Sequence, residues 1–486
     1  MEILSNTDDI LPTLLGWTPL FFGAGLLLLV LRRRERAMAF LFSVSTRSYV
    51  IAVVASVLLM TGVCGIVEFR VNPFGDSDRY LARSLNIVRY GVFGYGTAPT
   101  ALFPPGYSFL LLPAAWSLGA GRWTFFAINM AVLVAASWGV RSALRRLGVP
   151  LRPANFAALA VVLYPNRLLS TLLPASDIPF SLVYLCAFLC MLLSIAHPGR
   201  WRLALLTGLL GGAASLIRAN GLPLLIPLAA GILFSRQTPL RMRARNAGLI
   251  ALSALIVVAP WIVRNTILFG RVAPVSTNLG INLVIGNNPA STATYSASID
   301  SAWGGPEAWR DAGGALWDEA QRDSFLQGRG LRYIGEYPGR FIVRGCGKVY
   351  HMIASDASAF GMLETSANLR TLVFSIFPQL PPRSPALGFA YAVWSVGYRL
   401  LFILNNAAYY FVMLLSLVLL FRHRRRLTPP EGVYLTAFLV TLALSFVLFG
   451  ISRYKEPLPL LTLMLPLLAL FPPRGTSDYC PGDTPR

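Results

Sequence analysis

Long apolar runs without a charged residue recur along this chain, and they constrain its fold more than any other feature. Residues 21–31 and 458–471 carry no charge at all, whereas a helix on the surface of a soluble protein shows a polar face. Hydrophobic residues make up 55% of the 486 residues and charged residues only 13%, against roughly 25% in soluble proteins. The sequence therefore predicts an all-α, polytopic membrane protein and excludes an ordinary soluble enzyme and a disordered chain.

Positive charges lie in short clusters between the apolar runs. Lys and Arg number 42 against 21 Asp and Glu, which gives a formal net charge of +21. Such an excess also occurs in nucleic-acid-binding proteins, but short arginine-rich loops between apolar segments are typical of the cytoplasmic side of a membrane protein. We therefore predict no nucleic-acid partner and assign the four clusters to the cytoplasm; they are residues 32–36, 145–146, 241–245 and 422–426.

About 20 apolar residues are needed for a helix to cross a bilayer. The stretch 107–119 is too short, so we expect it to be an interfacial or re-entrant helix. Alternation from the arginine clusters then places two large loops, 68–121 and 264–398, outside the cytoplasm, the second with amphipathic interfacial helices. About eleven spans are predicted: 10–31, 49–67, 122–140, 154–173, 178–196, 203–217, 221–235, 247–263, 399–421, 432–450 and 457–472.

These spans divide the chain into five parts. An additional N-terminal helix with a basic cytoplasmic loop precedes the membrane core, which carries the first outer loop. The second outer loop, the C-terminal spans and a cytoplasmic tail follow. The five parts are residues 1–48, 49–263, 264–398, 399–472 and 473–486.

Charged residues gather at the predicted outer ends of the spans. Because a charge inside a membrane costs roughly 2.5–3.5 kcal/mol, this placement is informative. Arginine suits a lipid phosphate through paired hydrogen bonds, and a carboxylate suits a general base that accepts a proton from a hydroxyl. The mixture predicts group transfer from a phosphate-linked lipid; its members are Glu68, Arg70, Asp76, Asp78, Arg79, Asp177, Arg218, Arg264, Arg453, Lys455 and Glu456.

Four motifs in order resemble those of GT-C membrane glycosyltransferases. Residues 75–80, Gly-Asp-Ser-Asp-Arg-Tyr, followed by 103–107, Phe-Pro-Pro-Gly-Tyr, are similar to the first outer loop of that superfamily. The similar groups are the bacterial protein O-mannosyltransferases and aminoarabinose transferases, which are related to glycosyltransferase family 39. The further matching segments are 164–177, 260–265 with 280–289, and 453–459, so that the resemblance covers about residues 49–470.

The resemblance implies a GT-C fold, a polyprenyl-phosphate sugar donor and inversion at the anomeric carbon. It implies that Asp76, four residues before Tyr80, is the general base, and that Asp177 is a second acidic position. Asp78 is the alternative base, and Asp76-Ser77-Asp78 also resembles a metal-binding DxD element. The residues implied to bind the donor phosphate are Arg218, Arg264, Arg453 and Tyr454.

Simpler roles stand beside these assignments. Asp76, Asp78 and Asp177 each suit the N-cap of a helix, and the three arginines suit interface anchors. The family often has a lysine before the Pro-Pro pair, where this chain has Leu102-Phe103. One expected phosphate contact is therefore missing, which makes Arg218 or Arg453 more important for binding the phosphate. We expect no metal and no cofactor, with a divalent cation at Asp76 and Asp78 as the open alternative.

The function predicted from the sequence is that of a membrane glycosyltransferase, a hexosyl- or pentosyltransferase. It takes a sugar from a polyprenyl-phosphate donor and gives it to a glycan, lipid or protein acceptor. Because arginine outnumbers lysine forty to two, we expect a bacterial inner membrane with the active site facing the periplasm. The alternatives are a lipid-linked glycan transporter or flippase, which predicts polar residues buried mid-span, and a glycan polymerase or ligase.

Overall fold

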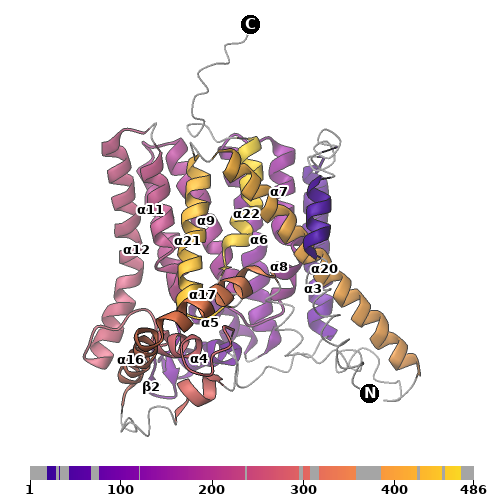
Figure 1. Ribbon diagram of the computed structural model, residues 1–486. Coiled ribbons are helices and arrows are strands. Elements are labelled where there is room, and N and C mark those ends of the chain that lie inside the picture. Colours follow the sequence, from indigo (N-terminus) through magenta and orange to yellow (C-terminus); the bar gives the residue numbers. More distant parts are fainter. Residues whose placement is uncertain are drawn as a thin grey trace.

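The computed structural model describes eleven segments of the chain, almost all of them helical (Figure 1). Side chains are described throughout these segments except at 66, 76–78, 300–301 and 385–395. Within this part of the chain the only sheet is a hairpin of two short strands, so the all-α prediction is confirmed. The described segments are residues 19–28, 32, 43–66, 76–119, 121–235, 238–294, 299–306, 317–356, 385–423, 427–450 and 455–471.

The elements follow one another in a simple order along the chain. The strands are β1 (Gly94–Tyr95) and β2 (Ala98–Pro99), which pair antiparallel between α4 and α5. The helices are α3 (Thr46–Ile66), α4 (Asp76–Tyr90), α5 (Gly106–Leu118), α6 (Arg122–Arg146), α7 (Leu151–Leu163), α8 (Pro165–Ser170), α9 (Asp177–Ala196), α10 (Trp201–Ile217), η1 (Ala219–Gly221), α11 (Leu225–Phe234), α12 (Leu240–Phe269), α13 (Leu279–Gly286), η2 (Asp300–Gly304), α16 (Glu319–Glu336), α17 (Pro338–Ile353), α20 (Pro385–Arg422), α21 (Pro429–Val447) and α22 (Leu458–Leu470).

Six of the described helices are long and apolar enough to cross a membrane: α3, α6, α9, α12, α20 and α21. The shorter apolar helices include α5, α7, α10, α11 and α22, so the number of eleven spans stays a prediction. The expected short helix near 107–119 is present as α5. The expected span 154–173 is interrupted between Tyr164 and Pro165, because proline disfavours the helical conformation of the residue before it.

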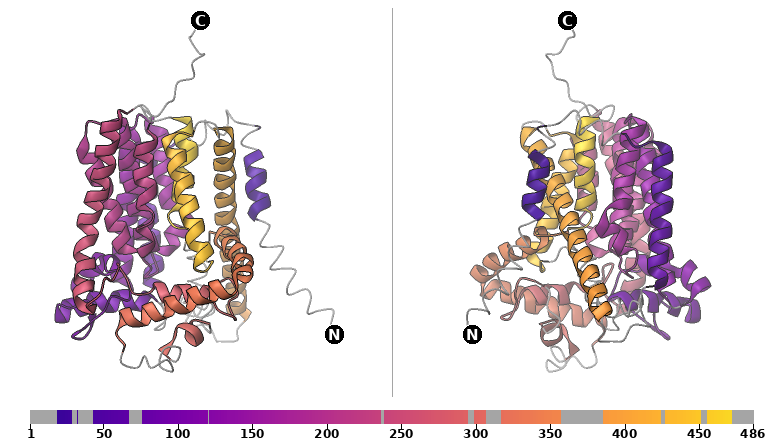
Figure 2. Two further views of the ribbon diagram at one scale, coloured as in Figure 1. Left: turned by 60° about the vertical axis from the view of Figure 1, so that its left-hand side comes forward. Right: turned by 90° about the vertical axis from the view of Figure 1, so that its right-hand side faces the viewer.

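The two large loops gather at one end of the helix bundle. In Figure 1, α4, the hairpin, α16 and α17 lie together at the lower end, and the two views of Figure 2 show the same arrangement. Helix α12 descends to this end from the opposite one, where it begins with the arginine cluster 241–245. The structure therefore separates this cluster from the large loops, as the charge pattern predicts.

Helix α9 forms the centre of the bundle. In its apolar window 83% of the residues are buried, against 22–50% in the other five long helices. Its neighbours are α6, α10, α11 and α22. Beside it, α10 packs closely on α12 because Gly208 has no side chain: a Cβ there would lie 2.0 Å from the Ser253 Oγ. This close approach holds α10, the helix that precedes Arg218, against α12.

A buried lysine attaches the amphipathic helix α17 to the bundle. The Lys348 Nζ donates hydrogen bonds to the Asn287 Oδ1 at 3.0 Å and to the carbonyl oxygens of Phe446 and Val447 at 3.2 and 3.3 Å. Those carbonyls belong to the last turn of α21, where a positive charge is favourable. Burial lowers the pKa of Lys348 to about 8. The second outer loop is thus joined to the end of a long apolar helix.

Candidate functional site

Two of the residues predicted for the site form an ion pair. Asp177 is the first residue of α9 and is 2% exposed, and its Oδ1 accepts a hydrogen bond from the Nη1 of Arg218. Arg218 follows the last turn of α10 in an extended conformation, with 12% of its side chain exposed. A predicted acidic position and a predicted phosphate contact, 41 residues apart in the sequence, therefore meet at one point.

Helix α4 contacts the residue that precedes α9 at one point. The Ser176 hydroxyl donates a long hydrogen bond of 3.5 Å to the hydroxyl of Tyr80, whose ring packs edge-to-face on Phe103 and Tyr107 at 5.5 and 5.3 Å between centroids. The helix begins at Asp76, four residues or about 6 Å of helix axis before Tyr80. The side chains of Asp76 and Asp78 lie outside the described part of the structure, so their roles stay predictions.

Arg264 occupies a different place. Its Nη1 donates hydrogen bonds to the carbonyl oxygen of Thr100 at 2.7 Å and to the Asn265 Oδ1 at 2.9 Å. Its Nη2 donates to the carbonyl oxygen of Phe93 at 3.3 Å, and the guanidinium lies 4.6 Å from the Trp261 ring centre. These contacts hold the loop around the β-hairpin against α12. They use three of its five N–H donors.

The remaining two predicted residues, Arg453 and Tyr454, lie outside the described residues. Directly after them, Lys455 and Glu456 precede α22. We expected these two charges at the outer rim, but both are buried within the bundle, at 2% and 0% exposure.

A second ion pair, which the sequence did not predict, is fully buried near the first. The Nη2 of Arg167 in α8 donates to the Oε2 of Glu456, and both side chains are 0% exposed. The Ser181 hydroxyl lies 2.7 Å from the same Oε2 and also 2.7 Å from the carbonyl oxygen of Asp177. Ser181 is one turn beyond Asp177 on α9, so this buried pair contacts the same end of α9 that carries Asp177.

A further group of buried polar residues continues from Arg167. The Tyr164 hydroxyl and the Asn166 side-chain amide both donate to the carboxylate of Asp356, which is fully buried at the end of the described part of the second loop. The Lys455 Nζ donates to the carbonyl oxygen of Ser355 and lies 3.9 Å from the Asp356 Oδ1. Two cations and two carboxylates are therefore enclosed together.

Helix α20 holds the same loop end by its backbone. The Asn405 Nδ2 donates to the carbonyl oxygen of Asp356 at 2.5 Å, and the Asn406 Oδ1 accepts from its backbone N–H at 2.8 Å. The hydroxyls of Tyr409 and Tyr410 donate to the carbonyl oxygens of Ile353 and Ala354. The second outer loop thus returns into the bundle at 353–356 and is fixed there.

One sequence signal could have identified part of this network. Arg167 lies inside the predicted span 154–173, where an isolated charge is costly. Pro165, two residues earlier, marks the point where the helix is interrupted. Asp356 has no comparable signal, because no motif surrounds it. Pairing between Arg167 and Glu456 joins residues 289 positions apart, which a single sequence does not reveal.

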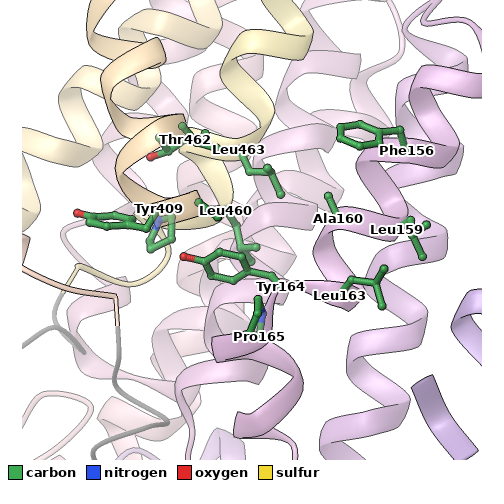
Figure 3. A pocket seen from close by; sticks show the side chains of 13 residues that line it. Phe156, Leu159, Ala160, Leu163, Tyr164, Pro165, Tyr409, Leu460, Thr462 and Leu463 are labelled. Carbon is green, nitrogen blue, oxygen red and sulfur yellow. The ribbon is translucent and has the colours of Figure 1, made fainter. Parts of the chain in front are cut away.

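An apolar cavity of about 300 Å³ adjoins this network between α7, α20 and α22 (Figure 3). Side chains such as Phe156, Leu163 and Leu463 form its walls. Tyr164 and Tyr409 separate it from the buried charges, since Tyr164 donates to Asp356 and the Tyr409 ring lies 3.9 Å from the Lys455 Nζ.

No cluster of three or more His, Cys, Asp and Glu that could hold a metal ion occurs among the described residues. The side chains of Asp76 and Asp78, on which the alternative cation site depends, are not among them.

Comparison with known proteins gives similar structures only at low identity. No protein-family model and no curated protein matches the sequence. ArnT from Cupriavidus metallidurans bound to undecaprenyl phosphate is similar with 17% identity and a TM-score of 0.42, over 87% of this chain and 79% of that chain.

Two oligosaccharyltransferase structures from Archaeoglobus fulgidus are also similar. The apo form has 15% identity and a TM-score of 0.44, over 88% of this chain and 50% of that one. AglB with an inhibitory peptide and a dolichol-phosphate has 16% identity and a TM-score of 0.39, over 87% and 50%. This chain thus spans about half the length of these two. All three structures belong to the GT-C superfamily, which the motifs resemble, but the likeness is too distant to assign a role to any residue.

Proposed function

We propose that this protein is a membrane glycosyltransferase that moves a sugar from a polyprenyl-phosphate donor to an acceptor outside the cytoplasm. The observation that carries the proposal is the meeting of α4 with the start of α9. It brings the helix that begins at Asp76 beside the buried Asp177–Arg218 pair, at the end of the bundle where the large loops lie. A carboxylate and a fixed cation at one place are what transfer from a lipid phosphate requires.

In this proposal the acceptor hydroxyl attacks the anomeric carbon of the donor sugar. A new glycosidic bond forms, the bond between that carbon and the phosphate oxygen breaks, and the configuration inverts. Asp76 accepts the hydroxyl proton, with Asp78 as the alternative base or as a partner in binding a cation. The leaving polyprenyl phosphate keeps the electron pair, and Arg218, assisted by Arg453 and Tyr454, stabilises its charge.

Asp177 has a different role in this scheme from that of a base. Its carboxylate is buried and paired with Arg218, so it orients the guanidinium rather than accepting a proton. Arg264 orients the loop around the hairpin through the contacts described above. We assign the phosphate contact primarily to Arg218.

The donor class follows the motifs, and the similar structures contain such lipids: undecaprenyl phosphate in one and a dolichol-phosphate in another. We propose a lipid of this kind as the donor, with a glycan, lipid or protein as acceptor. We propose a bacterial inner membrane with the active site on the periplasmic side; the arginine cluster 241–245 and the large loops lie at opposite ends of the bundle, which supports this orientation.

A flippase or transporter for lipid-linked glycans is the second candidate, and a specific observation favours it. Such a protein needs polar residues buried among its spanning helices, and Arg167, Asp356, Lys455 and Glu456 are buried in this way. The two functions differ in their product, since a transporter moves the lipid-linked sugar unchanged and a transferase releases polyprenyl phosphate.

The test compares cell-envelope glycans by mass spectrometry in cells that carry the natural protein, Asp76→Asn, Asp78→Asn or no copy. We expect one modified glycan to disappear in the cells without the protein and in Asp76→Asn, with expression and membrane insertion unchanged. Asp78→Asn tests the alternative base: loss of the glycan in Asp78→Asn with a normal level in Asp76→Asn assigns the base to Asp78. A glycan level near normal in Asp76→Asn excludes Asp76 as the base, and a lipid-linked precursor that accumulates in the cytoplasmic leaflet supports the transporter.

A further inference from the structure

The first turn of α9 carries Asp177 but has little local support. Its N-cap residue, Ser176, makes no side-chain hydrogen bond to the helix, so no side chain of this residue caps the free N–H groups of the first turn. Uncapped helix ends fray more easily than helix interiors. The position of Asp177 therefore depends on contacts from outside the helix.

Ser181 supplies such a contact one turn further along. Its hydroxyl lies 2.7 Å from the Asp177 carbonyl oxygen and 2.7 Å from the Glu456 Oε2. It has one proton to donate, and a carboxylate is the stronger acceptor. Glu456 is in turn fixed by the fully buried Arg167. Because Ser181 itself belongs to α9, its hydrogen bond to Glu456 attaches the start of this helix, and with it the backbone of Asp177, to the buried Arg167.

The buried Arg167–Glu456 pair is not explained by a contribution to folding stability alone. Both charges of the Arg167–Glu456 pair are buried, and such a pair is often no more stable than apolar side chains of equal volume. The Nε and Nη1 of Arg167 and the Oε1 of Glu456 have no hydrogen-bond partner among the described residues. What the pair provides instead is a fixed direction for the groups it contacts.

We propose that the buried Arg167–Glu456 pair is a positioning device for the Asp177–Arg218 pair and acts through the hydroxyl of Ser181. The inference rests on the proposed function in one respect, namely that Arg218 contacts the phosphate of the donor lipid. Arg167, Glu456 and Ser181 are positioning residues, since none of them is placed against the reacting atoms.

The test is a pair of double-mutant cycles on the purified full-length protein in nanodiscs. Ser181→Ala is combined with Arg218→Gln, and binding of undecaprenyl phosphate is measured by titration. Ser194→Ala is the matched control, because Ser194 is also fully buried on α9 but near its other end. The second cycle combines Ser181→Ala with Asp177→Asn and measures the unfolding midpoint without lipid.

We expect Ser181→Ala to weaken lipid binding about fivefold, and less than twofold when Arg218 is already replaced. Ser194→Ala is expected to leave binding within twofold of the natural protein. Equal losses in both Arg218 backgrounds, or no loss beyond that of Ser194→Ala, overturn the inference.

The cycle without lipid separates this inference from the proposed function. If the natural protein does not bind undecaprenyl phosphate, the proposed role of Arg218 fails, and the unfolding midpoints alone decide the inference. Shifts of Ser181→Ala and Asp177→Asn that are not additive support the mechanical link, and additive shifts overturn it.

Discussion

Replacing Glu456 by glutamine should destabilise the protein more than any change at its outer surface. The two side chains of the Arg167–Glu456 pair are 0% exposed, and two of the guanidinium nitrogens have no hydrogen-bond partner among the described residues. Glu456→Gln removes the direct partner of Arg167 and leaves two buried cations, Arg167 and Lys455, enclosed with a single carboxylate, that of Asp356. Removing one partner of a buried pair costs about 3–5 kcal/mol, which at about 2 °C per kcal/mol lowers the unfolding midpoint by roughly 6–10 °C.

The assay is thermal unfolding of the purified protein in detergent, followed by intrinsic fluorescence. The matched control is the double variant Arg167→Met with Glu456→Leu, which removes both charges and keeps most of the volume. We expect its midpoint within about 1 kcal/mol of the natural protein, because replacing a whole buried pair is often neutral. If Glu456→Gln is as stable as the double variant, the pair is not a buried ion pair and this reasoning is refuted.

Two further predictions concern the junction where the second outer loop meets α21. The pKa of Lys348 is lowered to about 8 in the folded protein, so above that pH the unfolded chain binds more protons than the folded chain. The free energy of unfolding contributed by this lysine therefore rises between about pH 8 and 10. Unfolding midpoints at pH 7 and 9.5 should show this rise in the natural protein and not in Lys348→Met; equal pH responses contradict it. Gly286→Ala should destabilise by about 1–3 kcal/mol in denaturant unfolding, since its Cβ would lie 1.5 Å from the Leu448 carbonyl oxygen, whereas Gly335→Ala, in open space on α16, should be neutral or stabilising. Equal effects of the two glycine substitutions count against the close approach.

The long helices were predictable because their signals are local. Residues 178–196 were expected as a span, and α9 runs from Asp177 to Ala196, since the apolar run ends at polar residues on both sides. Residues 122–140 were expected as a span, and α6 continues to Arg146 because its arginines extend the helix beyond the apolar part. Composition within a window of about 20 residues is enough for such elements.

The pairing of the charges was not predictable in the same way. Asp177 and Arg218 were both singled out, but their contact depends on how α10 packs beside α9, which no local pattern records. Arg167, Asp356 and Lys455 come from three separate parts of the chain and meet only in the folded bundle.

The buried charges connect two segments that are far apart in the sequence, and each segment needs the charges of the other to be stable in the bundle. The end of the second loop brings Asp356, and the turn before α22 brings Lys455 and Glu456 to Arg167. Two positive and two negative groups balance, whereas any one of them alone would be a buried charge without compensation. A transporter that opened a path through this region would have to separate these groups at several kcal/mol for each pair, in every cycle. An enzyme can keep the region closed and use it to hold its site, so the same network that suggests transport is better suited to catalysis at a fixed position.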